Sequence, residues 1–497
     1  MKRVASGILP VVAINRTSPL PLHRQIYDGF RSAILEGRLR PGQRIPSTRV
    51  LAAEIHVSRF PVLNAYAQLL AEGYLESRVG AGTIVSSSLS AQLTSSRPGG
   101  TQAIPAQRRP RPLATRSSVL PRKENLPWIV HLGAFRVGQV AFDQFPHQVW
   151  SSLVGRRSRA MNAHSAHYGD SMGNGRLRRA ISNYLKIARS VRCEPEQVLV
   201  VNGSQQALEI TTRALLDPGA RVWIEEPCYR LAQDVFRLNR CQLVPVPVDE
   251  EGLNVAAGIA KCRKARAAFV SPSHQFPLGV TMSASRRLRL IEWAQSSGAW
   301  IIEDDYDSEY RYQSQPIASL QGLDPNSRVI YIGTFSKVLF PALRLGYIVV
   351  PPDMVDGFRE TRRVMDLGSP TFHQEVLADF VEEGHFERHI RRMRTFYGEL
   401  RRLLVDNLRE HLEKTLSPIG DEAGMHLTAM LDTRHRDEEV AAQAVRLGLS
   451  LWPLSRLYLN RPRQGFVLGF GGITTKEIPL AVRALCTLLD SKGVRLR

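Results

Sequence analysis

Residues 331–347 read YIGTFSKVLFPALRLGY, in which an apolar run ends on a turn that carries a single lysine, Lys337. Hydroxyl side chains flank this lysine at Thr334 and Ser336, and Arg344 follows seven residues after it. A lysine forms a Schiff base most readily where its pKa is lowered, while hydroxyls, turn amides and a guanidinium bind a phosphate beside it. The stretch therefore predicts that Lys337 binds pyridoxal 5'-phosphate. Because a Ser-Lys pair is also typical of an exposed turn, the prediction depends on further motifs.

Short apolar runs alternate with longer amphipathic segments from about residue 127 onward, at 198–201, 221–224, 267–270, 300–302 and 329–332. Such runs are typical of buried parallel strands, and the segments between them are typical of covering helices. Residues 127–497 are therefore predicted to form an α/β domain, with a mostly parallel sheet that carries helices on both faces. Beyond about residue 390 helices are expected to dominate, in a smaller C-terminal α/β subdomain.

Two further segments before Lys337 suit a phosphorylated aromatic cofactor. Residues 202–208 form a small-residue turn into a helix, where the free N–H groups of Gly203, Ser204 and Gln205 can bind a phosphate. Tyr229 follows the next apolar run and is placed to stack on a pyridine ring, although buried packing is an alternative role.

An acidic cluster, IEDDYDSEY at 302–310, follows the fourth apolar run. A carboxylate at the carboxyl end of a strand keeps a pyridine nitrogen protonated, and we assign this role to Asp304. Tyr306 would then donate to the phenolic oxygen of the cofactor. Asp305 is the alternative to Asp304 if the register is shifted by one residue.

Residues 1–85 show apolar positions at helical spacing and predict helices over 22–36, 47–55 and 58–72. The short joint between the second and third helices is typical of a helix-turn-helix, and a Gly-rich β-wing follows. The predicted small core consists of Ala53, Ile55, Val57, Val62, Tyr66 and Leu69. Donors at the start of a helix in the major groove, and wing amides near the backbone, would bind DNA. The predicted DNA-binding residues are Ser47, Arg49, Ser58, Arg59, Gly80 and Gly82.

The chain carries 66 Lys and Arg residues against 46 Asp and Glu residues, a formal net charge of +20. Residues 1–125 hold 18 basic and 6 acidic residues, and this excess of +12 (18 − 6) favours a polyanionic partner, double-stranded DNA. A basic surface that only aids solubility has the same charge. Residues 86–126 are rich in Ser, Pro, Gly and Arg and predict a basic linker between domains at 1–85 and 127–497.

Other classes of protein are disfavoured by the composition. No apolar stretch approaches the roughly 20 residues of a membrane span, and the first residues lack a secretion signal, so a cytoplasmic location is expected. The five cysteines are scattered without a Cys-x-x-Cys pair, which argues against a disulfide framework or a zinc site.

Both parts of the chain resemble known families. The block from PLHRQIYDGF at 21–30 to AYAQLLAEGYLESRVGAGTIV at 65–85 resembles the winged helix-turn-helix of GntR regulators, and Arg49 and Arg59 fall on that family's DNA-contacting arginines. The segments quoted above from 202 to 347 resemble a fold-type I aminotransferase of class I. Together the two blocks make the chain similar to the MocR-type subfamily of GntR regulators.

This resemblance implies a head-to-tail homodimer in which Tyr168, in the segment YGDSMG, reaches the phosphate of the partner's cofactor. It also implies control of genes of vitamin B6 or amino-acid metabolism. At Phe60-Pro61 the chain departs from the residues that related regulators carry, so the operator sequence does not follow from the resemblance.

Two departures concern the expected cofactor site. Aminotransferases of this class bind the α-carboxylate of the substrate through an arginine near the C-terminus, where this chain has Val467, and Arg463 is a substitute only with an offset of four residues. Phe276 stands where an asparagine would bond the cofactor. Without the arginine, an amino acid is expected to bind weakly.

Three functions remain open from the sequence. The first is a transcriptional regulator that senses pyridoxal phosphate, or a small amino compound that reacts with it, through a change in the dimer. The second is a working aminotransferase with an accessory DNA-binding head, which the missing arginine and the basic head disfavour. The third is a scaffold that binds the cofactor only for stability.

Overall fold

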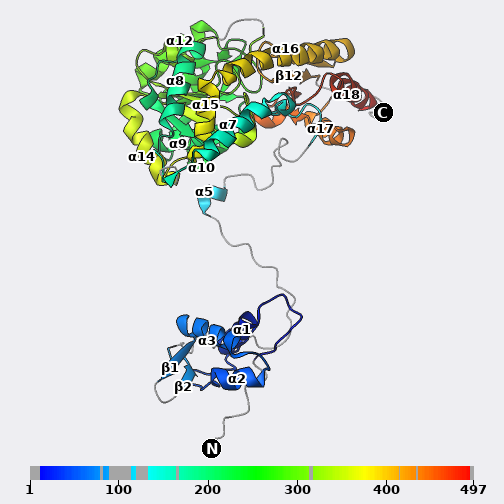
Figure 1. Ribbon diagram of the computed structural model, residues 1–497. Coiled ribbons are helices and arrows are strands. Elements are labelled where there is room, and N and C mark those ends of the chain that lie inside the picture. Colours follow the sequence, from blue (N-terminus) through cyan, green and yellow to red (C-terminus); the bar gives the residue numbers. More distant parts are fainter. Residues whose placement is uncertain are drawn as a thin grey trace, which may run out of the picture. The chain divides into compact units, whose positions relative to one another are not determined.

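The computed structural model describes residues 12–78, 82–88, 114–118, 132–163, 167–312, 317–413, 415–432 and 435–492. The chain forms two compact units, Met1–Arg111 and Pro112–Arg497 (Figure 1). Most of the predicted linker, residues 86–126, lies outside the described residues, and its limits stay a prediction. No helix in the described ranges has the length and apolar character needed to cross a bilayer.

The N-terminal unit is a winged helix-turn-helix, as the sequence predicts. Its helices and strands are α1 (Leu22–Leu35), α2 (Thr48–Glu54), α3 (Arg59–Ala71), β1 (Leu75–Arg78) and β2 (Gly82–Val85). The two strands pair antiparallel to form the wing, and Arg44 makes a bridge to Ile84 beside them. Each predicted helix differs from the observed one by no more than a residue at either end, because the apolar spacing and the turn residues mark both limits.

The small core of this unit corrects one prediction. Val62, Tyr66 and Leu69 are buried as expected, but Ala53 is exposed and its neighbour Ala52 packs inside instead. Helix α2 has only seven residues, so its short apolar pattern fits two faces and does not decide which alanine faces inward.

The C-terminal unit is built on an eight-stranded sheet with the order β3-β10-β9-β8-β7-β4-β5-β6. These strands are β3 (Val198–Val201), β4 (Arg221–Glu226), β5 (Gln242–Asp249), β6 (Gly252–Leu253), β7 (Ala267–Val270), β8 (Trp300–Asp305), β9 (Val329–Thr334) and β10 (Gly346–Val349). The pairs from β9 through β5 are parallel, whereas β10 runs antiparallel to both β3 and β9. All five predicted apolar runs are strands of this sheet.

Alternate residues of these strands pack against helices on opposite faces of the sheet. One face, with Ile302 and Ile332, packs against α9 (Ser204–Leu215), α10 (Arg230–Leu238) and α14 (Val355–Asp366). The other face packs against α8 (Gly175–Arg189), α11 (Val255–Cys262), α12 (Ala284–Ser297), α15 (Thr371–Glu382) and α16 (His385–Leu412). Three further helices are α5 (Thr115–Ser118), α7 (His147–Arg159) and α13 (Leu320–Leu323). Burial on both faces explains why the strands appear as continuous apolar runs.

The last part of the chain is an α/β subdomain, as the sequence predicts, although none of its strands was located from the sequence. It contains a four-stranded antiparallel sheet in the order β11-β12-β14-β13, together with α17 (Asp437–Ala444) and α18 (Glu477–Lys492). The strands are β11 (Leu416–Ile419), β12 (His426–Leu431), β13 (Trp452–Pro453) and β14 (Gly465–Gly469). Strand β14 is buried at every position and β12 at nearly every one, so neither shows the alternation that identifies a strand in a sequence.

A buried carboxylate, Asp379 of α15, joins three helices of this unit. Its side chain is only 2% exposed and forms ion pairs with Arg156 and Arg157 of α7 and with Arg176 of α8. The Arg156 and Arg176 pairs are both 2.9 Å long. Although burial opposes it, hydrogen bonds from the three guanidinium groups hold the pKa of Asp379 well below its usual range. The carboxylate is therefore a stabilising centre of the fold.

We expect Asp379→Asn to lower the free energy of unfolding by about 2 kcal/mol at pH 7, because one half of a buried ion-pair network is lost. A carboxyl group with a depressed folded pKa stabilises the protein above its unfolded pKa of about 3.9, and this contribution is lost as the pH falls. The difference between wild type and variant should therefore shrink below about pH 4. Urea unfolding at pH 7 and at about pH 2.5 measures both effects, and an equal difference at the two pH values would contradict the assignment.

Candidate functional site

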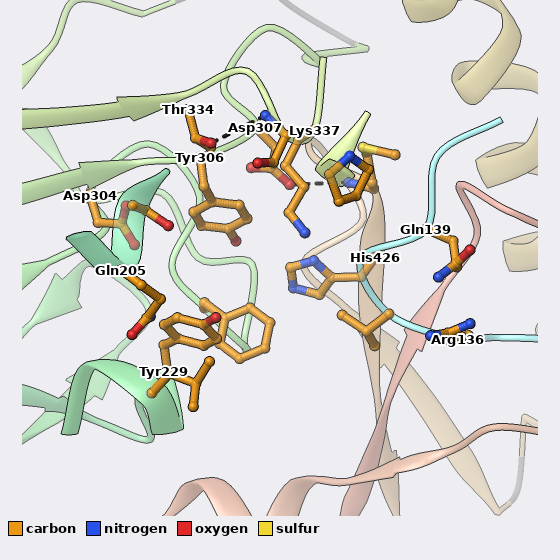
Figure 2. A pocket seen from close by; sticks show the side chains of 18 of the residues that line it. Arg136, Gln139, Gln205, Tyr229, Asp304, Tyr306, Asp307, Thr334, Lys337 and His426 are labelled. Carbon is orange, nitrogen blue, oxygen red and sulfur yellow. Dashed lines mark hydrogen bonds between the residues drawn. The ribbon is translucent and has the colours of Figure 1, made fainter. Parts of the chain in front are cut away.

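A cavity of about 340 Å³ lies at the carboxyl ends of the parallel strands of the large sheet, where it also meets the C-terminal sheet (Figure 2). In open α/β sheets this edge is the usual place for a ligand, because loops from several strands converge there. The structure brings most of the predicted cofactor residues to this cavity. They are Ser204, Gln205, Tyr229, Asp304, Tyr306, Thr334, Ser336, Lys337 and Arg344.

Lys337 follows β9 and extends into the centre of the cavity (Figure 2). Removal from water lowers the pKa of its amine, while the carboxylates of Asp307 and Asp304 act in the opposite direction. A Cβ atom built on Gly138 would lie 3.0 Å from Nζ of Lys337, so the chain at this glycine packs closely against the amine. A desolvated lysine with a lowered pKa is suited to act as a nucleophile toward an aldehyde.

Asp304 and Asp305 point to opposite sides of β8. Asp305 forms a buried ion pair of 2.9 Å with Arg189, away from the cavity. Asp304 lines the cavity, and its Oδ1 atom has no hydrogen-bond partner among the described residues. Burial, followed by the charges of Asp305 and Asp307, raises the pKa of Asp304 to about 7. A buried acceptor without a donor fits the N–H of a protonated pyridine ring, so these residues fit the proposed cofactor.

In the cofactor-free protein, we expect Asp304→Asn to reduce the dependence of the free energy of unfolding on pH. The pKa of Asp304 is about 7 in the folded chain and about 3.9 in the unfolded chain, so the folded state binds more protons between these values. Stability therefore falls as the pH rises from about 4 to 7, and it falls less steeply in the variant. Burial raises the pKa of Glu225 to about 8, so this residue contributes a pH dependence of stability that remains in both proteins. Identical slopes in urea unfolding would contradict this assignment.

The end of the cavity beside α9 has the donors that a phosphate needs. Gly203, at φ 83°, is the N-cap residue of α9, and Ser204 is the first residue of that helix. A Cβ atom on Gly203 would lie 3.2 Å from the guanidinium of Arg344, so a glycine lets this arginine approach the helix start. Arg344 also donates to the carbonyl oxygen of Asn202 at 3.0 Å. Helix N-terminal amides and a guanidinium at one place form an anion-binding arrangement.

Aromatic side chains form the wall between the two ends. Tyr229 lies edge-on to Phe276, with ring centroids 5.6 Å apart, and both residues line the cavity. Tyr306 donates its hydroxyl hydrogen to the carbonyl oxygen of His274 at 2.9 Å. Phe276 stands where the sequence comparison expected an asparagine, so this position supplies an apolar surface and no side-chain hydrogen bond.

Sequence reasoning missed several residues of this cavity, namely Arg136, Gln139, Asp307, His426 and Trp452. Asp307 belongs to the acidic cluster identified in the sequence, but it follows the end of β8, where the strand period no longer tells which side chains share a face. Its carboxylate accepts from His274 Nδ1 at 3.1 Å and from the backbone N–H of Met425 at 3.2 Å. His426 and Trp452 come from the C-terminal sheet, where no motif marked them.

Two other sequence predictions lie outside the cavity. Tyr168 is 90% exposed and lines a separate hollow with residues 366–371. Val467 is fully buried in β14, opposite Thr428 and Trp452 in the strand register. Arg463 is exposed and does not belong to the residues that line the cavity.

The N-terminal unit gathers exposed polar groups at the starts of α2 and α3. Arg49 and Arg59 are both exposed, and Nε of Arg59 donates to the Thr48 hydroxyl at 3.1 Å. Ser47 caps α2 by accepting from the N–H of Val50. Ser58 occupies the N-cap position of α3, but its side chain makes no capping hydrogen bond with the described residues.

The wing adds one further basic residue to this surface. Gly82 has φ 84°, and a Cβ atom there would lie 3.2 Å from the guanidinium of Arg44. Sequence reasoning missed Arg44, which is exposed and bridges to the wing through Ile84. Gly80, the other predicted wing residue, lies outside the described residues.

Comparison with known proteins assigns a family to each unit. Residues 22–85 match the bacterial regulatory proteins of the gntR family, and residues 135–454 match aminotransferase class I and II. A solved structure, kynurenine aminotransferase of Pyrococcus horikoshii, aligns with a TM-score of 0.71 and 25% identity, over 76% of this chain and 97% of its own. LysN, an α-aminoadipate aminotransferase of Thermus thermophilus, aligns with the same TM-score of 0.71 and 25% identity, over 77% of this chain and 98% of its own.

Relatives with both units cover nearly the whole chain. The probable rhizopine catabolism regulatory protein MocR of Rhizobium meliloti is 40% identical over 97% of both chains. PdxR of Corynebacterium glutamicum, a pyridoxine biosynthesis transcriptional regulator, is 30% identical over 93% of this chain and 94% of its own. The gntR-type unit implies DNA binding, and the aminotransferase fold implies binding of pyridoxal phosphate. The chain belongs to the MocR-type transcriptional regulators, in which a GntR winged helix-turn-helix is fused to an aminotransferase-like domain.

Proposed function

We propose that this regulator binds pyridoxal 5'-phosphate at Lys337. Its affinity for DNA changes when it binds the cofactor, or when an amino compound reacts with the bound cofactor. One observation carries the proposal: the lysine shares a cavity with the buried, unpartnered Oδ1 of Asp304. A buried acceptor is seldom left without a donor, and a protonated pyridine supplies one. When bound, the cofactor offers an aldehyde carbon to primary amines.

The residues of the cavity divide into three roles. Lys337 anchors the aldehyde end, and Asp304 accepts from the ring nitrogen. The start of α9 and Arg344 would hold the phosphate, with Ser204, Gln205, Thr334 and Ser336 as hydroxyl and amide donors. Tyr229 would pack on the ring, and the hydroxyl of Tyr306 would donate to the phenolic oxygen in place of the carbonyl of His274. Val467 stands where aminotransferases of this class carry the arginine that binds the substrate carboxylate, which favours a sensor over a fast aminotransferase.

The assembly that we propose is a head-to-tail homodimer in the cytoplasm. Tyr168 supports this dimer. Its side chain is 90% exposed in one chain, and in the dimer it would contact the phosphate of the partner's cofactor. The names of the relatives, for rhizopine catabolism and pyridoxine biosynthesis, suggest that the regulated genes belong to metabolism of vitamin B6 or of amino compounds.

The DNA affinity of the full-length protein tests this proposal. A fragment from the region upstream of its own gene is titrated with cofactor-free protein and with cofactor-loaded protein. We expect the two affinities to differ by at least about fivefold, the lower end of common coupling between two sites. Lys337→Ala should abolish the difference, and Lys476→Ala, a change of an exposed lysine, should preserve it. Equal affinities with and without cofactor, and with amines added, would exclude a sensor.

A further inference from the structure

The wall of the cavity beside the C-terminal sheet is apolar and aromatic. Phe276 and Trp452 line it, with ring centroids 5.4 Å apart. Val467, Leu454 and Leu457 are buried behind them in one apolar cluster. A ligand group that faces this wall therefore meets carbon surfaces and the faces or edges of aromatic rings.

The two carboxyl groups and the imidazole of the cavity offer no positive charge to an anion. The carboxyl groups belong to Asp304 and Asp307. His426 is buried, and burial followed by the neighbouring His274 lowers its pKa well below the usual value, so its ring is neutral. The Nε2 atom of His426 lies 3.2 Å from the carbonyl oxygen of Pro277, which fixes a proton on that nitrogen.

Two arginines also line the cavity. Arg344 is held at the phosphate end by the carbonyl of Asn202. Arg136 lies beside Gln139 on the far side of His426 from Asp304, as Figure 2 shows, and it also lines a second, outer hollow with Leu132 and Leu449. A carboxylate on the aromatic wall would thus be desolvated against carbon surfaces, while Arg344 is held at the phosphate end and Arg136 is shared with the outer hollow.

We propose that the small molecule recognised in this cavity is a primary amine that carries no carboxylate group. Its carbon skeleton packs on Phe276 and Trp452, and its nitrogen lies beside Lys337, where Asp307 attracts the ammonium form. The inference rests on the proposed function, because it names the class of compound that the same site takes. It separates this protein from sites built to hold amino acids through both their amine and their carboxylate.

Three pairs of compounds that differ only in a carboxylate test the inference. They are 2-phenylethylamine and L-phenylalanine, 3-methylbutylamine and L-leucine, and tryptamine and L-tryptophan. Isothermal titration of the cofactor-loaded full-length protein gives a Kd for each compound, and the same titrations with free pyridoxal phosphate correct for differences in intrinsic reactivity. In every pair that binds we expect the amine to bind at least about tenfold more tightly than the amino acid.

Variants of Phe276 and Arg136 distinguish a ligand held at the aromatic wall from one held at the rim of the cavity, which is the part lined by Arg136. Phe276→Leu should weaken the amines several-fold, because it removes an aromatic surface but keeps the volume apolar. Lys476→Ala, a change of an exposed lysine outside the cavity, should leave the amines unchanged, and Arg136→Gln shows whether a carboxylate binds at this arginine. Amino acids that bind as tightly as their amines, or that lose affinity in Arg136→Gln, would assign a carboxylate to the rim and overturn the inference. So would the absence of binding by all six compounds at millimolar concentration.

Failure of the inference is distinct from failure of the proposed function. Retention of the cofactor is measured on the protein before any amine is added, and the DNA titration needs no amine. A protein that retains the cofactor and couples it to DNA, yet prefers amino acids, would keep the proposed function and lose only the ligand class.

Discussion

Lys337→Ala is expected to give a colourless protein, whereas the wild type purified from cofactor-replete cells absorbs visible light. The reason is that only a Schiff base to a lysine conjugates the cofactor ring with the protein, and Lys337 is the lysine that lines the cavity. Absorption spectra of the two proteins measure the effect. Treatment of the wild type with borohydride, followed by mass spectrometry of its peptides, should locate the reduced cofactor on the peptide that contains Lys337.

The matched control is Lys476→Ala, which removes an exposed lysine and should leave the spectrum unchanged. Because Lys337 is surrounded by the core of the C-terminal unit, far-ultraviolet circular dichroism must first show that the variant is folded. A colourless wild type, or a cofactor trapped on another lysine, would remove Lys337 from the centre of the site. The loss in the variant should be complete, since no other described lysine lies against the cavity.

Arg59→Ala is expected to weaken binding of the full-length protein to its upstream DNA about 100-fold, or about 2.7 kcal/mol. Arg59 is exposed at the first position of α3, where a helix presents side chains to base edges or phosphates in the major groove. Its hydrogen bond to Thr48 at the start of α2 holds the guanidinium at the joint of the two helices. Fluorescence anisotropy at several salt concentrations measures the affinity and its salt dependence.

Salt dependence shows which kind of contact Arg59 makes. A phosphate contact would lower the slope of log Kd against log salt by about 1, whereas a base contact would leave the slope almost unchanged and relax specificity. Arg24→Ala is the control of equal charge change, because Arg24 lies in α1 and pairs with Asp28 on the surface. If Arg24→Ala weakens DNA binding as much as Arg59→Ala, the effect is one of net charge and the assigned interface is wrong.

The strands and the cofactor residues of the large sheet could be predicted because their signals are local. Each buried strand is a continuous apolar run, and Asp304, Thr334 and the start of α9 all follow such runs. Since parallel strands end at one edge, residues that follow them meet there without any knowledge of the loops. The helices of the N-terminal unit were predictable for a similar reason, because their apolar spacing and short joints are contained in a few dozen residues.

Other features could not be predicted from local patterns. The strands of the C-terminal α/β subdomain were not located because β14 is buried on both sides and β13 has only two residues, so neither has a strand period. Ala53 was assigned to the core although Ala52 occupies that place, since a helix of seven residues is too short for its apolar pattern to define one face. Asp307 was seen only as part of an acidic cluster, although it links His274 with the backbone of Met425.

The sequence by itself determined the two-part organisation, the winged helix-turn-helix, the mostly parallel sheet and the lysine around which the cavity forms. Tertiary structure alone decided that Asp304 faces the cavity while Asp305 pairs with Arg189, and that His426, Trp452 and Phe276 form the opposite wall. The physical reason is that strand period and turn chemistry depend on neighbours in the chain. The charge and polarity that a ligand meets depend instead on side chains that folding brings together from segments more than 100 residues apart, such as Asp304 and Trp452.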